Sequence, residues 1–188
     1  MRYEKGRKDA SRSRIMEVAA DRFRGDGIAA SGLATIMSAA GLTNGAFYPH
    51  FQSKAELVRE SIAAAMELQA QQLAEALASG GPEMAIEAYL SAEHRDNPGK
   101  GCASAALLPE LARQPLETRE VYTDRLLALA HQLAEAFPQA KDPEGVALAV
   151  FATLIGALQM ARAMKGTELS DRILAAGKEA ARTLIEQG

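Results

Sequence analysis

The stretch from Ser31 to Leu57, SGLATIMSAAGLTNGAFYPHFQSKAEL, constrains the fold more than any other part of this sequence. Its apolar residues lie three or four positions apart, which gathers side chains on one face of a helix: Leu33, Ile36 and Met37, then Phe47 and Phe51. Between the groups, Gly41 can take the positive φ of a helix-ending residue. The stretch therefore predicts two short helices joined by a tight turn, the first capped by Ser31 or Gly32.

The segment from Asn44 to Phe51 is the second of these helices, with one edge buried and its polar residues facing outward. This layout is that of a helix-turn-helix, whose second helix enters the major groove of DNA while the first crosses the backbone. A helix pair with a glycine between also occurs in many other helical proteins, so the spacing alone leaves a structural role open. The run from Tyr48 to Lys54 and the basic residues before the pair favour DNA binding.

Two patterns connect this region to a known family. The sequence reads AxxxFRxxG in the helix before the pair and then SxLxxIxxxAGLTxGAFYxHFxSKxxL, over residues 12 to 60. It resembles the TetR family of transcriptional regulators (TetR/AcrR-like). The resemblance implies a homodimer with a four-helix interface, and a divergent C-terminal part that binds a ligand. Ala34, Thr35 and Met37 depart from the residues common in the family, so the bases that are read stay open.

The residues expected to contact DNA flank and include the second helix. Phosphates supply most of the affinity, and base edges supply the choice of sequence. Asn44 is suited to read adenine through two hydrogen bonds, and Lys54 to bind phosphate at a helix N-terminus. The resemblance assigns Tyr48 to the DNA backbone. The full set is Arg12, Arg14, Ser31, Thr43, Asn44, Gly45, Ala46, Tyr48, His50 and Lys54.

Charge is unevenly distributed along the chain. Residues 1–60 hold 10 Lys and Arg against 7 Asp and Glu, a net +3, and residues 61–188 hold 11 against 17, a net −6, which gives the total of −3. The excess is sharpest in residues 1–14, a basic arm whose first ten residues we expect to be disordered without DNA. Such an end attracts a polyanion, although a solvated tail is an alternative interpretation of the arm taken alone.

The chain as a whole follows helical periodicity, without strand alternation or repeats, and predicts an all-α fold of about nine helices. We expect a three-helix helix-turn-helix DNA-binding domain with its basic arm over residues 1–52. A helical ligand-binding and dimerisation domain is expected over residues 53–188. Its first helix, over residues 53–78, would connect the two domains, starting at a capping box of Ser53 and Glu56.

Breaks in the pattern divide the second domain. Gly80-Gly81-Pro82 ends the connecting helix, and residues 93–101 predict a polar loop. Glu93, His94 and Asp96 in that loop are interpreted as a solvated charge cluster.

The second domain is expected to enclose a mostly apolar cavity between its helices. Eight candidate ligand contacts are chosen by pattern alone: Met66, Leu90, Cys102, Leu107, Tyr122, Leu126, His131 and Met160. Core packing explains the apolar members equally well, and an ordinary packed or surface histidine explains His131. Cys102 follows Lys100 and Gly101 at a helix start, a setting that favours reaction with oxidants or electrophiles, while a small buried cysteine is the alternative.

The last two helices, near residues 143–164 and 170–187, differ from the others. The first is apolar around much of its circumference, and the second carries a stripe of small residues. With the family resemblance, they favour a dimer interface of two helices from each subunit, and a monomer core is the alternative. The interface candidates are Val150, Leu154, Leu158, Ile173, Gly177, Ala180 and Leu184.

Motifs of other functions are missing from the sequence. There is no GxGxxG, GxxxxGK[ST], GxSxG or HExxH, and His50, His94 and His131 are too far apart to suggest a metal site. We therefore expect no enzyme activity, no catalytic residue, no metal and no cofactor. No apolar run approaches a membrane span and the first residues lack a signal peptide's apolar region, so we expect a cytoplasmic protein. A single cysteine agrees with a reducing compartment.

These observations predict a ligand-responsive transcriptional regulator, a repressor by preference over an activator. It would bind a pseudo-palindromic DNA operator as a homodimer and be released by a small-molecule effector, with an electrophile or oxidant as one candidate signal. The alternative is a helical small-molecule-binding or protein-adaptor domain without a DNA function.

Overall fold

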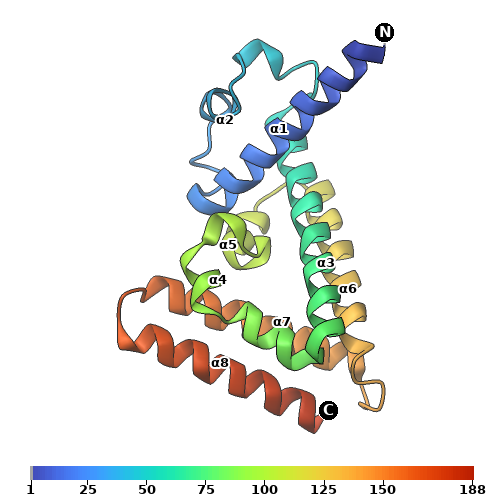
Figure 1. Cartoon of the computed structure of the whole chain (residues 1–188), viewed down its shortest axis with the longest axis vertical. Coiled ribbons are helices and arrows are strands. Elements are labelled where there is room, and N and C mark those ends of the chain that lie inside the picture. The colour runs from blue at the N-terminus through green and yellow to red at the C-terminus, as the bar shows by residue number, and fades with distance from the viewer. Residues whose placement is uncertain (1) are drawn as a thin grey trace.

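The computed structural model describes residues 2–188, with side chains from Lys8 onward, and every regular element in this part of the chain is helical (Figure 1). The elements, with η for a 3₁₀ helix, are α1 (Arg2–Asp26), α2 (Leu33–Ala39), η1 (Asn44–Ala46), α3 (Lys54–Tyr89), α4 (Ala92–Asp96), η2 (Pro98–Lys100), α5 (Ala103–Leu111), α6 (Leu116–Ala134), α7 (Pro143–Ala163) and α8 (Glu168–Gln187). The predicted all-α fold is confirmed.

α1 is longer than the sequence pattern suggests. The expected disorder is wrong for residues 2–10, whose backbone is helical. Most of these residues are Arg, Lys, Glu and Ala, which have high helix propensity. Met1 and the side chains of the basic arm's Arg2, Lys5 and Arg7 lie outside the described residues.

α3 contains the predicted break. Ser53 caps its start, accepting a hydrogen bond from the Glu56 amide at 3.1 Å. Gly80 and Gly81 then leave the helical conformation, with φ/ψ of −165°/22° and 65°/−161°, and the helix resumes at Pro82. Because Pro82 lacks an amide hydrogen, it suits the first turn of the resumed helix. The predicted end of the connecting helix at this point is confirmed.

The predicted polar loop over residues 93–101 instead holds two short helices, α4 and η2. Ser91 initiates α4 by accepting a hydrogen bond from the His94 amide at 3.1 Å, a cap that the sequence reading missed. The helices α7 and α8 lie close to their predicted positions.

The elements are arranged along the length of the molecule (Figure 1). α1, α2 and η1 occupy one end, α3 runs beside α6 toward the other, and α7 and α8 pack together there with the C-terminus. α4 and α5 lie between the two ends. One cluster of buried apolar side chains runs through both ends, from Ile15 in α1 to Ala181 in α8.

α7 is the one helix in residues 2–188 with the length and composition to cross a membrane, and 39% of its most apolar window is buried within the subunit. The core helix of a water-soluble protein has the same profile, so this feature alone is weak evidence for a span.

Candidate DNA-binding surface and effector cavity

Ser31, a predicted cap and DNA contact, lies in the turn between α1 and α2. Gly32, not Ser31, is the N-cap residue of α2. The Ser31 side chain is 1% exposed, and its hydroxyl donates to the Gly27 carbonyl oxygen at 2.7 Å. The prediction that Ser31 contacts DNA is therefore wrong for this conformation, because its hydroxyl is used inside the subunit.

The predicted second helix is shorter than expected. Only Asn44–Ala46 is helical, as one turn of 3₁₀ helix, and residues 47–50 continue as turns. Pro49 explains the difference, because it has no amide hydrogen to donate to the residue four positions earlier, and it disfavours the helical conformation of Tyr48. The His50 and Phe51 amides both donate to the Phe47 carbonyl oxygen, at 2.9 and 3.1 Å, and this keeps the segment compact.

Two aromatic rings fix this segment to the core. Phe47 and Phe51 are each 1% exposed, and their rings stack with centroids 5.5 Å apart, so the predicted buried edge is confirmed. On the opposite side, Thr43, Asn44 and Gly45 are exposed. The Tyr48 side chain is 69% exposed, whereas Ala46 and His50 are half-buried.

The basic DNA candidates have partners within the subunit. Arg12 pairs with Glu60 and places its guanidinium 4.7 Å from the centroid of the Phe51 ring. Lys54 donates to the Ile28 carbonyl oxygen at 2.6 Å. Each cation therefore stabilises the fold as well as carrying charge. Arg14 is more exposed and lies 3.0 Å from Glu17.

The pKa of His50 shows which charged residues lie near the exposed segment. The pKa of His50 is lowered by burial first, then by the positive charges of Lys8 and Arg12. Its Nδ1 atom is buried and has no hydrogen-bond partner among the described side chains. Cations on α1 therefore lie close to the segment that presents Thr43 to Tyr48, and their field would attract phosphate.

Glu110 of α5 connects this domain to the rest of the chain. Its two carboxylate oxygens accept hydrogen bonds from the Ile28 amide at 3.1 Å and the Ala29 amide at 2.8 Å. Gly27 makes room for this contact, since its φ is 92° and a Cβ there would lie 2.8 Å from a Glu110 carboxylate oxygen. Sequence reasoning missed Glu110, because no local pattern marks a carboxylate that bonds residues 81 and 82 positions away.

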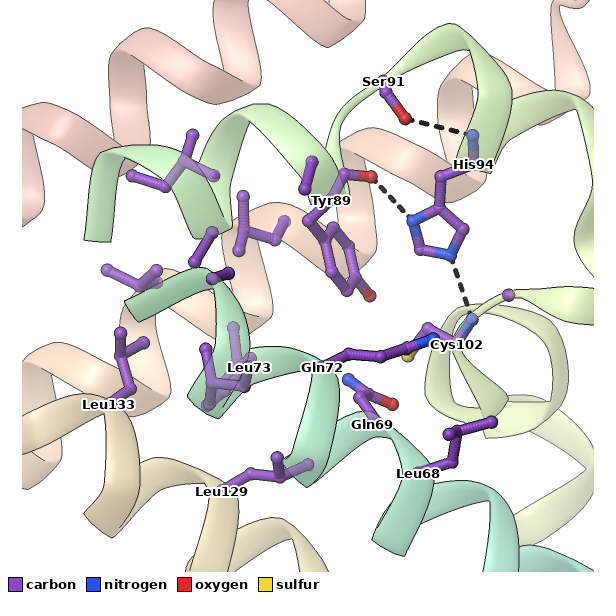
Figure 2. A pocket seen from close by; sticks show the side chains of 18 of the residues that line it. Leu68, Gln69, Gln72, Leu73, Tyr89, Ser91, His94, Cys102, Leu129 and Leu133 are labelled. Carbon is purple, nitrogen blue, oxygen red and sulfur yellow. Dashed lines mark hydrogen bonds between the residues drawn. The ribbon is translucent and has the colours of Figure 1, made fainter. Parts of the chain in front are cut away.

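A cavity of about 490 Å³ lies between the two halves of α3 and the helices α4, α6 and α7 (Figure 2). Its apolar lining includes Leu73, Ile86, Leu129, Leu133, Phe151 and Leu154, and its polar lining includes Arg24, Gln69, Gln72, Tyr89, His94 and Cys102. The volume is in the range that encloses small organic molecules. The predicted mostly apolar cavity is present, and α1 contributes Arg24 to its wall.

Of the eight predicted ligand contacts, only Cys102 lines this cavity. The other seven are placed wrongly. Met66, Leu90 and Leu107 are fully buried in the core, and Leu126 packs against it. The hydroxyl of Tyr122 donates to Ser104 at 3.0 Å, His131 is exposed beside Glu144, and Met160 is 53% exposed. Helical spacing shows that a side chain points inward, but not whether it meets another side chain or a cavity.

His94 organises the polar end of the cavity. Its Nδ1 lies 2.7 Å from the Tyr89 carbonyl oxygen, and its Nε2 accepts a hydrogen bond from the Cys102 amide at 2.9 Å (Figure 2). A neutral ring protonated on Nδ1 satisfies both contacts. Burial lowers the pKa of His94, against the raising effect of the Tyr89 carbonyl, which agrees with a neutral ring. The interpretation of residues 93–96 as a solvated cluster is therefore wrong for His94.

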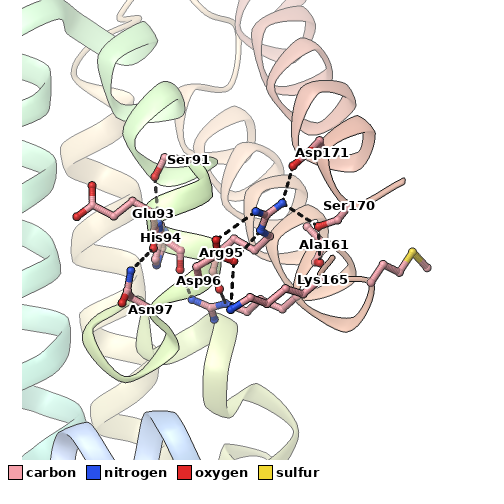
Figure 3. A network of polar contacts seen from close by, with 12 residues as sticks. Ser91, Glu93, His94, Arg95, Asp96, Asn97, Ala161, Lys165, Ser170 and Asp171 are labelled. Carbon is pink, nitrogen blue, oxygen red and sulfur yellow. Dashed lines mark hydrogen bonds and ion pairs between the residues drawn. The ribbon is translucent and has the colours of Figure 1, made fainter. Parts of the chain in front are cut away.

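The same segment is fixed to α7 and α8 by a polar network (Figure 3). Arg95 donates to Asp96 at 2.9 Å, to Ser170 at 3.0 Å and to Asp171 at 2.6 Å. Hydrogen bonding from Arg95 is the main cause that lowers the pKa of Asp96. Arg162 of α7 donates to the His94 carbonyl oxygen at 2.9 Å. The network holds α4 in place over the cavity.

The predicted interface residues divide into two groups. Val150, Leu154, Leu158 and Gly177 are buried within the subunit, so assigning them to a dimer interface is wrong. A Cβ at Gly177 would lie 2.5 Å from the Ala157 Cβ atom, so this glycine permits close packing of α7 and α8. Ala180 is exposed, and Ile173 and Leu184 are half-buried.

The fold and the exposed segment together define a class of protein. A helix-turn-helix whose polar edge faces solvent is joined by a long helix to a second helical unit that holds a small-molecule cavity. The class is that of helix-turn-helix proteins, which place the second helix of the motif in the major groove of DNA.

One segment of the chain matches a known protein family. Residues 15–61 match the family model described as bacterial regulatory proteins, tetR family. No curated protein matches the chain. The match assigns residues 15–61 to this family, and the solved structures share the fold of the whole chain.

Solved structures share this fold over nearly the whole chain. A TetR-family regulator from Cytophaga hutchinsonii is 20% identical, with a TM-score of 0.79, covering 96% of this chain and 95% of its own. The reduced form of NemR from Escherichia coli is 19% identical, with a TM-score of 0.76, covering 90% and 96%. A TetR regulator from Chloroflexus aurantiacus is 23% identical, with a TM-score of 0.76, covering 100% and 98%.

Proposed function

We propose that the protein is a homodimeric repressor that binds a pseudo-palindromic operator and is released by a small molecule in the cavity. The observation that carries this proposal is the exposed edge of Thr43, Asn44, Gly45 and Tyr48, held in place by the buried rings of Phe47 and Phe51. Its side chains can reach base edges and phosphates, and the cations of α1 lie beside it.

The dimer would form through the outward faces of α7 and α8. The exposed or half-buried side chains of these helices recur at helical spacing on one face: Ala149, Ala152, Thr153, Gly156 and Met160 of α7, with Leu169, Ile173, Ala176, Ala180 and Thr183 of α8. A Cβ at Gly156 would meet nothing within 4 Å in the subunit, so this glycine leaves room for another helix. A two-fold axis here would present two DNA-binding ends.

The effector would act by changing the spacing of these ends. The cavity is lined by α1 and by both halves of α3, the helix that begins at Lys54 beside the DNA-binding segment. A ligand that favours a spacing unsuited to the operator by about 1–3 kcal/mol would weaken DNA binding by roughly 5- to 150-fold.

Selection from random duplexes with the purified protein tests the proposal. We expect an enriched inverted repeat whose half-sites lie about 34–36 Å apart, or a multiple of that spacing. The logarithm of affinity should fall with the logarithm of salt concentration by about 0.9 per phosphate contact. A protein adaptor would enrich no sequence and show little salt dependence, and that outcome would overturn the proposal.

Cys102 supports an electrophile or oxidant as a second candidate signal. The cysteine lines the cavity, so a molecule that enters can reach its sulfur. Treatment of the wild-type protein with a thiol-reactive compound should weaken DNA binding, whereas a Cys102→Ser variant should keep its affinity. Equal behaviour of the two proteins would remove this candidate.

A further inference from the structure

Two polar groups in the cavity wall have no hydrogen bond of normal geometry among the described residues, although the Cys102 thiol is close enough to the Tyr89 hydroxyl to affect its pKa. The atoms are the hydroxyl oxygen of Tyr89 and the side-chain carbonyl oxygen of Gln69. Both are buried, and neither makes a hydrogen bond of normal geometry within the described part of the chain. They come from the two halves of α3 on either side of the Gly80–Gly81 kink, and they lie on opposite sides of the Cys102 side chain (Figure 2). A buried polar group without a hydrogen bond is unfavourable, so this pair points to something that enters from outside.

Most of the other polar groups nearby are already used, although the exposed Gln72 side chain also lines the cavity and the Arg162 Nη1 atom is buried without a partner among the described residues. The Ser91 hydroxyl caps α4, and both ring nitrogens of His94 have backbone partners. The Asn97 side chain donates to the Glu93 carbonyl oxygen at 2.8 Å. Among the described residues that line the cavity, Tyr89 and Gln69 are therefore the buried groups left to select a ligand at this end.

Both groups can act as hydrogen-bond donors. Burial, followed by the neighbouring Cys102 thiol, raises the pKa of Tyr89 well above its ordinary value, so the phenol keeps its proton. The two ends of the Gln69 amide are nearly equal in shape, and a half-turn would present its NH₂ group to the cavity. Two donors favour a ligand group that accepts hydrogen bonds.

The charge at this end is positive. Arg24 lines the cavity and uses its Nε to donate to the Gly99 carbonyl oxygen at 2.6 Å, which leaves the rest of its guanidinium available. Burial is the main cause that lowers the pKa of Arg24, and the negative charge of Asp21 opposes this effect. Glu93 and Lys100 also line the cavity, and both are exposed and of opposite charge. A half-buried guanidinium favours an anion.

We propose that the cavity binds an amphipathic carboxylate. Its carboxylate oxygens accept hydrogen bonds from Tyr89 and Gln69 in the field of Arg24, and its apolar chain or ring occupies the space between Leu73, Leu129 and Phe151. The proposed carboxylate binding is argued from the cavity alone. Its effect on DNA binding rests on the proposed function.

Three probes with the same chain test the ligand class: octanoate, 1-octanol and octylamine. Binding is measured by calorimetric titration and by thermal unfolding of the DNA-free protein. We expect octanoate to bind tightest and octylamine weakest. Tyr89→Phe should weaken octanoate binding roughly tenfold or more, because a hydrogen bond to a charged group is lost. Tyr122→Phe, which removes a hydroxyl outside the cavity, is the matched control and should change binding less than twofold.

Arg24→Gln should remove the preference for octanoate over 1-octanol, and thermal unfolding without ligand checks that the variant folds. Octylamine binding as tightly as octanoate, or full octanoate affinity in Tyr89→Phe, overturns the proposal. DNA release is measured separately. Octanoate binding to a protein with no affinity for DNA would contradict the proposed function and leave the cavity assignment in place.

Discussion

Glu110 is the single side chain with the largest expected effect on how the DNA-binding end is held. Its carboxylate accepts the amides of Ile28 and Ala29, in the turn that leads into α2. Glu110→Gln keeps one acceptor but turns an NH₂ group toward an amide hydrogen. We expect a loss of about 1–3 kcal/mol in the free energy of unfolding, measured by urea denaturation, and weaker operator binding. Glu120→Gln, at an exposed position of α6, should leave both unchanged.

His94 predicts a pH dependence of stability. Its pKa in the folded state lies below the ordinary value of 6.5, so the unfolded chain takes up the proton first as pH falls. The contribution of His94 to the free energy of unfolding is complete above pH 6.5 and decreases as the pH falls below that value. His50, whose pKa is also lowered, contributes in the same direction. Unfolding curves recorded through this range should show a shallower decline for His94→Gln than for wild type. A decline in His94→Gln as steep as that of wild type would contradict the assignment.

The exposure of Thr43, Asn44, Gly45 and Tyr48 could be predicted from sequence, because one short segment with a buried aromatic edge carries all four. The effector residues could not. Tyr89 and Gln69 lie 20 positions apart in the sequence and meet across the cavity only because α3 bends between them. Leu107 and Leu129 are both apolar helix residues and both are buried, yet only Leu129 lines the cavity.

Among the elements, α3 depends on one backbone conformation. Gly81 has φ/ψ of 65°/−161°, a region that only glycine adopts readily. Gly81→Ala should lower the free energy of unfolding by about 1–3 kcal/mol, measured by chemical denaturation. Gly25→Ala is the control, because Gly25 lies in α1 with open space for a Cβ, and this change should be neutral or slightly stabilising. Equal losses in both variants would show that the kink is not the cause.

Element positions could be predicted well where glycine, proline or a capping residue interrupts the helical period. The break at Gly80–Gly81 and the start at Ser53 are examples. Faces of helices could not be assigned as reliably. α7 is apolar on most sides, so Val150 and Leu154 could not be distinguished by sequence from side chains that face outward. The length of the recognition segment was also overestimated, since the effect of Pro49 outweighs the helical spacing of its aromatic residues.

At the scale of the whole molecule, the proposed dimer predicts a difference between neighbouring positions of α8. Ala176 lies on the outward face that we assign to the interface, and Ala175, also exposed, lies about 100° away around the helix. Ala176→Glu should bury a charge between subunits, giving a monomer in sedimentation experiments and a loss of cooperative operator binding. Ala175→Glu should remain dimeric. A dimeric Ala176→Glu variant would place the interface elsewhere.

The sequence suggests a domain boundary at residue 52, but hydrogen bonds connect the residues on its two sides. Arg24 of α1 bonds to Gly99, and Glu110 of α5 bonds to the turn at Ile28. A hybrid regulator made by joining this DNA-binding segment to a relative's effector domain would lose both contacts at once. Operator specificity should therefore be exchangeable between relatives when only the residues around Thr43 to Tyr48 are transplanted. The exchange should fail when the whole DNA-binding domain, residues 1–52, is transplanted.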